Sequence, residues 1–174
     1  MKKTMVILSL FIIILLASNV TDDLIIPDNS IRVRVVANSN SSSDQLIKQM
    51  VKNKLEEDIT NLLSEAKNIN DARRIIEDNI ELINISVKTA LQENGYDTDY
   101  EVDFGYNLFP EKKYKGVVYK EGYYESVVVT LGKGEGNNWW CVLFPPLCLM
   151  ETDESNLEEI EYKSFIKEII DKYF

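Results

Sequence analysis

The chain has 174 residues, 45% of them hydrophobic, and a net charge of −10 at pH 7. This length and composition suit one domain with a buried core, and the acidic balance disfavours nucleic acid and anionic membrane surfaces as partners. The sequence has no histidine and only two cysteines. It therefore cannot form Ser-His-Asp or Cys-His catalytic groups, imidazole zinc sites, or a four-cysteine metal site within one chain. We predict a protein that is not an enzyme and has no cofactor or metal.

Residues 1–20 have the order of a secretory signal. Lys2 and Lys3 precede an apolar run that extends from Met5 to Ala17, which is the order of the basic and apolar regions of such signals. The run is shorter than the roughly 20 residues that span a bilayer, although a tilted helix extended to Val20 nearly reaches that length. We therefore predict export, with residues 1–20 as a signal peptide or an N-terminal membrane anchor.

The next segments predict a tether, a strand and two helices. Residues 21–30 contain Pro27 and are predicted to be a tether before a single domain at 31–174. Residues 31–37 alternate apolar and basic side chains and then become apolar, which predicts a strand. Ser42 with Gln45 has the form of a capping box that opens a first helix. A second helix is predicted from Asn70–Asp71 to Gly95.

The second half of the chain predicts four strands and a last helix. From Asp99 the apolar period changes to two, which predicts a half-buried strand that ends at Phe109. Further strands are predicted at 115–119, 124–131 and 139–144, and a helix at 162–174. The order β-α-α-β-β-β-β-α predicts an α+β fold, with helices packed on one face of a mainly antiparallel sheet.

The segment from Gly132 to Cys148 combines glycines, tryptophans and prolines. Its three glycines do not form a dinucleotide site, because a strand and not a helix follows them, so we expect a hairpin loop with positive φ angles. Trp139 and Trp140 are adjacent on a strand and must point to opposite faces. Core packing is the favoured role for both, and a contact with a partner protein is the alternative. The candidate partner-binding residues are Gly132, Gly134, Gly136, Asn138, Trp139, Trp140, Pro145 and Pro146.

Cys141 and Cys148 are on either side of the proline pair. An exported chain can form a disulfide if the prolines fold the segment back so that the two Cα atoms approach within about 7 Å. The alternative is two buried, inert thiols. The disulfide is slightly favoured, and both alternatives stay open at this point.

Several segments resemble the stage II sporulation protein R family in chain order. They include Ile26–Pro27 followed by residues 31–39, Ala72–Ile76, and Val102–Phe104 with Phe109–Pro110. The most specific match begins at Tyr124–Glu125 and continues to Cys148. The resemblance implies a protein that is made in the forespore and exported into the space between the septal membranes. There it would activate the membrane-embedded aspartic protease SpoIIGA of the mother cell, which processes pro-sigma-E.

Two other functions are alternatives to signalling. A hydrolase acting on the cell wall could use a pair of carboxylates among Asp103, Glu125 and Glu135. A module that binds carbohydrate or peptide could stack a solvent-facing tryptophan on its ligand. Hydrolysis ranks low, because an acidic chain brings carboxylates together by chance.

Overall fold

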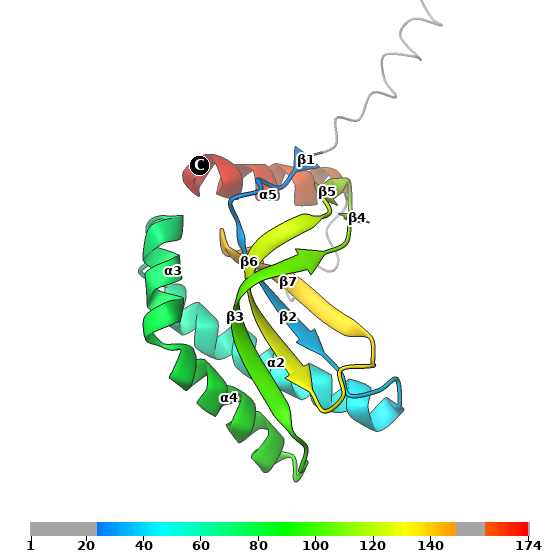
Figure 1. Cartoon of the computed structure of the whole chain (residues 1–174). Coiled ribbons are helices and arrows are strands. Elements are labelled where there is room, and N and C mark those ends of the chain that lie inside the picture. Colours follow the sequence, from blue (N-terminus) through cyan, green and yellow to red (C-terminus); the bar gives the residue numbers. More distant parts are fainter. Residues whose placement is uncertain (1–23, 149–158, 174) are drawn as a thin grey trace, which may run out of the picture.

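The structure is a computed structural model that describes residues 24–148 and 159–173 (Figure 1). A four-stranded sheet has the order β3-β6-β2-β7, and a small sheet has the order β1-β5-β4. The strands of the large sheet are β2 (Ile31–Val36), β3 (Tyr100–Phe109), β6 (Gly122–Leu131) and β7 (Asn138–Phe144). Those of the small sheet are β1 (Leu24–Ile25), β4 (Lys112–Tyr114) and β5 (Val117–Tyr119).

The helices are α2 (Ser42–Leu63), α3 (Ile69–Asp78), α4 (Ile80–Glu93) and α5 (Glu159–Tyr173). Figure 1 shows α2, α3 and α4 on one side of the large sheet, and α5 beside β1 and β5. The α+β class is confirmed. The placement of α5 differs from the expectation that all helices cover one face, since its apolar residues pack with those of the other face.

Alternation along the strands gives the large sheet two different faces. In β2, Ile31, Val33 and Val35 belong to the core under the helices, whereas Arg32 and Arg34 point to the other face. β2 runs parallel to β6, while the β2–β7 and β3–β6 pairs are antiparallel. The sheet is thus mixed and mainly antiparallel, as predicted.

Two hydrophobic clusters cover the two faces. The larger one joins β2, β6 and β7 to the apolar stripes of α2, α3 and α4, and includes Val51, Leu55 and Ile83. The second cluster lies on the opposite face between the large sheet, the small sheet and α5. Its buried members are Ile26, Phe109, Val117, Tyr119, Tyr124, Trp140, Val142, Leu147, Tyr162, Ile166 and Ile169.

Two local predictions in the helical region were wrong. The N-cap of α2 is Ser41 and not Ser42: the Ser41 hydroxyl accepts a hydrogen bond from the Asp44 N–H at 3.1 Å. The helix predicted from Asn70 to Gly95 is two helices, because Asn79 leaves the helical conformation with φ −120°. Its side-chain amide donates to the Ile75 carbonyl at 2.8 Å, which terminates α3.

The segment predicted as a tether contributes to the folded structure. Leu24–Ile25 pairs in parallel with β5, and Ile26 is buried in the second cluster. The predicted signal at 1–20 lies outside the described residues. Within residues 24–148 and 159–173, none of the helices combines the length and apolarity needed to cross a bilayer.

Candidate partner-binding surface

The loop between β6 and β7 is held against the loop that follows β2. Gly132 and Gly134 have φ angles of 55° and 65°, so the expected positive φ is found at two of the three glycines. At Gly136 the reason for glycine is a close approach, since an added Cβ would lie 2.3 Å from the Ser39 carbonyl oxygen. The Gly136 N–H donates to the Ala37 carbonyl at 2.9 Å. These glycines serve local structure.

Polar side chains reinforce this pairing of the two loops. The Asn38 side-chain oxygen accepts from the Lys133 N–H at 3.0 Å, and that of Asn40 accepts from the Asn137 N–H at 2.7 Å. Lys48 of α2 donates to the Asn137 carbonyl at 3.2 Å. The hairpin therefore presents few free backbone donors, and its exposed residues are Lys133, Glu135, Asn137 and Asn138.

Asp44 organises the loop after β2. Its carboxylate accepts hydrogen bonds from the Ser39 hydroxyl at 2.5 Å, from the Asn38 amide at 3.0 Å and from the Tyr96 hydroxyl. Hydrogen bonds from Ser39 and then Tyr96 lower the pKa of Asp44 to about 2. The carboxylate is therefore ionised at neutral pH and connects α2 to the loop after β2 and to the segment after α4.

Trp140 is buried and Trp139 is half-buried, on opposite faces of the sheet as predicted. Trp140 is 8% exposed and forms edge contacts with Phe109 and Tyr119, with ring centroids 5.4 Å away in each case. Trp139 is half-buried against the larger cluster, with the Lys52 ammonium 5.0 Å from its ring centroid. The small sheet and α5 form the layer that covers Trp140. Because Trp140 is buried, its ring is not available to stack on a carbohydrate ligand.

The end of β7 places prolines and cysteines close to the interior. Pro145 is buried, whereas Pro146 is partly exposed and lines a cavity of about 240 Å³ between α2 and β7. Cys141 and Cys148 are separate, buried thiols, and the Cys148 Sγ lies 3.0 Å from the Val142 carbonyl oxygen. The disulfide and the contact role of the hairpin both stay predictions.

Arg32 is a buried charged residue that packs against aromatic members of the second cluster. It is fully buried, and its Cζ lies 3.3 Å from the Tyr124 ring centroid and 5.2 Å from that of Phe109. None of its side-chain nitrogens forms a hydrogen bond with a described residue. Burial lowers the pKa of Arg32, and the nearby Tyr124 partly offsets this. The guanidinium is held by aromatic faces, which attract cations.

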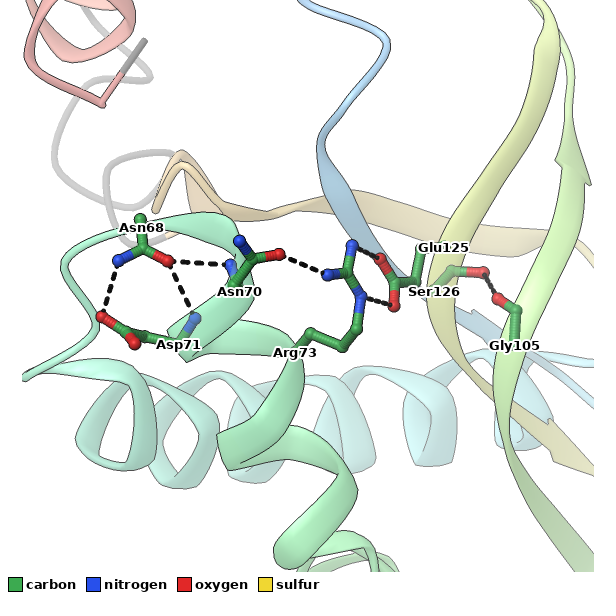
Figure 2. A network of polar contacts seen from close by, with 7 residues as sticks. All are labelled: Asn68, Asn70, Asp71, Arg73, Gly105, Glu125 and Ser126. Atoms are coloured by element: carbon green, nitrogen blue, oxygen red, sulfur yellow. Dashed lines mark hydrogen bonds and ion pairs between the residues drawn. The ribbon is translucent and has the colours of Figure 1, made fainter.

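An ion pair joins α3 to β6 (Figure 2). The Arg73 guanidinium donates to both carboxylate oxygens of Glu125, at 2.5 and 2.8 Å, and to the Asn70 side-chain oxygen at 2.7 Å. Hydrogen bonding to Glu125 raises the pKa of Arg73. Asn68 caps α3 by accepting from the Asn70 and Asp71 N–H groups, both at 3.0 Å. This bidentate pair fixes α3 on the sheet.

The acids considered for hydrolysis do not form a pair. Glu125 lies opposite Tyr106, so its side chain points to the face opposite that of Asp103. Glu125 is also engaged by Arg73, while Glu135 lies in the β6–β7 loop. Among the described residues, no cluster of three or more ligand-type side chains could hold a metal ion.

Exposed apolar side chains gather where the helices stop covering the sheet. Tyr106 is 71% exposed, Leu108 is 50% exposed and Tyr123 is 70% exposed. Leu108 and Tyr123 are directly opposite each other in the β3–β6 register, and Tyr106 is next to them on the same face. We call these three residues the β3 patch. Contiguous exposed apolar residues on a rigid sheet are typical of protein contacts.

Comparison with known proteins places this fold in a family. The family model described as stage II sporulation protein R matches residues 27–154. The chain belongs to this family. Stage II sporulation protein R of Bacillus subtilis (strain 168) is 37% identical over 174 residues, covering 92% of this chain and 76% of the relative. No solved structure matches the chain. Membership in the stage II sporulation protein R family gives the chain a role in sporulation.

The structure shows what sequence reasoning missed within this family member. Residues 72–76 and 124–125 each resemble the family in sequence, but the sequence does not show that they are in contact. In the structure the Arg73–Glu125 ion pair joins them. The sequence also does not reveal the β3 patch. Tyr106 and Leu108 continue the alternation of Tyr100 and Val102, and this pattern predicts that all four side chains are buried.

Proposed function

We propose that this protein is an exported signal of endospore formation that binds and activates a membrane-embedded aspartic protease of the mother cell, the SpoIIGA type, leading to processing of pro-sigma-E. It is made in the forespore and acts in the septal intermembrane space, reaching the membrane only through residues 1–20. It is not an enzyme. The family gives the sporulation role. The observation that carries binding to a protein is the β3 patch, whose tyrosines are 71% and 70% exposed on the sheet face that packs against the helices.

Reconstitution tests this function. Vesicles that contain the receptor protease would hold pro-sigma-E on the side of the protease domain, and the purified chain without residues 1–20 would be added on the other side. We expect cleavage of the pro-sequence only when the chain is present on the side that corresponds to the intermembrane space. In the control, the chain is placed on the same side of the vesicle membrane as pro-sigma-E. Absence of cleavage, or equal cleavage from either side, would contradict the proposal.

A further inference from the structure

We propose that the open edge of β3 receives an extended segment of the receptor as an added strand, and that this segment carries apolar residues at one end and basic residues at the other. The inference rests on the proposed function and specifies the contact. It follows from the position of β3 in the sheet, from the β3 patch, and from two carboxylates on the same strand.

The edge itself provides the backbone partners. β3 is ten residues long and pairs with β6 along its full length, from Tyr100 opposite Leu131 to Phe109 opposite Gly122. It is the terminal strand of the sheet, and no other strand in the described part of the chain pairs with it. A long edge strand exposes a row of N–H and C=O groups that another chain can pair with.

The β3 patch provides an apolar half to this edge. Tyr106 and Leu108 lie on the strand itself, and Tyr123 extends the apolar surface to the neighbouring strand. Glu125, opposite Tyr106, is bound by Arg73 of α3, and the Arg73 guanidinium also donates to the Asn70 side chain, so the backbone beneath the patch is fixed before any partner arrives (Figure 2). A preformed surface costs little ordering entropy on binding.

Two exposed carboxylates provide an acidic half. Glu101 and Asp103 alternate with the core-facing residues of β3 and point to the other face of the sheet. Basic side chains on an added strand would be attracted to them. Antiparallel pairing of two copies along the whole edge would place the acidic half of each copy beside residues 105–109 of the other, none of which is basic, so charge favours a basic partner over a second copy.

The register fixes the pattern of the partner. In an antiparallel added strand, the two residues opposite Leu108 and Tyr106 are apolar and two positions apart. The two residues opposite Asp103 and Glu101 are basic and are also two positions apart. The first basic residue follows the second apolar residue by three positions. This odd offset is required because the two halves of the edge present opposite faces of the sheet.

The test compares two charge-reversal variants of equal net charge. Glu101→Lys with Asp103→Lys, the edge variant, changes β3. Glu57→Lys with Glu65→Lys, the α2 variant, changes one exposed acid in α2 and one in the turn that follows it. Binding of each chain to vesicles that contain the receptor would be measured at about 0.15 M and 0.5 M salt. We expect the edge variant to bind at least about tenfold more weakly at the lower salt, with a smaller difference at the higher salt. The α2 variant should stay within about twofold of the unchanged chain.

Two further readouts address the strand itself. Hydrogen exchange of residues 100–109 should slow when receptor vesicles are added, and Tyr106→Thr with Tyr123→Thr should weaken both binding and this protection. Equal binding by the edge and α2 variants, or no protection of β3, would overturn the edge assignment while leaving signalling intact. A stable dimer in sedimentation that protects β3 without receptor would also overturn it. Failure of the unchanged chain to bind would overturn the proposed function and this inference with it.

Discussion

Single side chains connect segments that are far apart in the chain. Asp44 accepts hydrogen bonds from residues before and after α2, including Tyr96, 52 positions away. Arg73 and Glu125 are also 52 positions apart. Each contact satisfies a polar group that would otherwise be costly at the edge of a core. These residues therefore hold the elements in one arrangement.

Replacement of Asp44 should change the pH dependence of stability. The pKa of Asp44 in the folded protein, about 2, is below its ordinary value of 3.8, so the ionised carboxylate stabilises the fold at neutral pH. This contribution is complete above about pH 4 and is lost as the pH falls toward 2. Asp44→Asn should therefore be less stable than the unchanged chain at pH 7, and the gap should narrow toward pH 2. Urea midpoints measured at both pH values check this.

The control for this experiment is Asp97→Asn, which removes one exposed carboxylate at another position. It should leave the midpoint at pH 7 nearly unchanged, because a substitution at the surface is generally close to neutral. A gap between Asp44→Asn and the unchanged chain that stays constant down to pH 2 would show that ionisation of Asp44 is not responsible.

Replacement of Arg32 should separate its charge from its packing. The guanidinium is fully buried against Tyr124 without a hydrogen-bonding partner among the described residues, so its desolvation is poorly compensated. Arg32→Met keeps most of the volume and should leave the free energy of unfolding unchanged or raise it by about 1 kcal/mol. Arg32→Ala leaves a cavity and should lower it by about 2–4 kcal/mol. Denaturant unfolding at pH 7 measures both; an equal loss in the two variants would show that the charge itself stabilises the fold.

At the scale of elements, two loops act as one unit. The β6–β7 hairpin binds the turn after β2 through main-chain bonds such as Glu135 N–H to the Asn38 carbonyl at 3.1 Å. α2 begins at the end of the same turn, with Ser41 as its N-cap. The dense glycine content of the hairpin is thus explained by packing against a neighbouring loop, and a partner is not required for it.

Gly136→Ala tests this packing. The added Cβ would lie 2.3 Å from a backbone oxygen that cannot move without displacing the turn. We expect the free energy of unfolding to fall by about 1–3 kcal/mol. Gly105→Ala in β3 is the matched control, because its Cβ would meet its nearest atom at an ordinary 3.5 Å, and it should change stability by less than about 0.5 kcal/mol. Equal unfolding midpoints for the two variants in guanidinium would refute the close contact as the reason for Gly136.

At the scale of the whole molecule, the large sheet separates two cores. The larger one lies under α2, α3 and α4, and the second lies under α5 and the small sheet (Figure 1). Coverage of both faces accounts for the near-continuous apolar character of β7 and for the burial of Trp140. The β3 patch and the acidic residues of β3 are at the edge of this arrangement, where a partner has access.

The sequence alone determined the features that depend on local periodicity. The alternation in residues 99–109 predicted β3, the apolar stripes predicted α2, and adjacency placed Trp139 and Trp140 on opposite faces. Family membership followed from short motifs in chain order. These features need no knowledge of distant residues, because strand and helix periods are set by the backbone.

Only the tertiary structure decided which segments meet. The parallel pairing of β2 with β6, the position of α5 on the second face and the Arg73–Glu125 contact all depend on pairing across long stretches of chain. The exposure of Tyr106 and Leu108 was decided in the same way, because an alternating strand does not reveal where the covering helices end. Local sequence fixes the direction of a side chain, whereas burial depends on what lies opposite it.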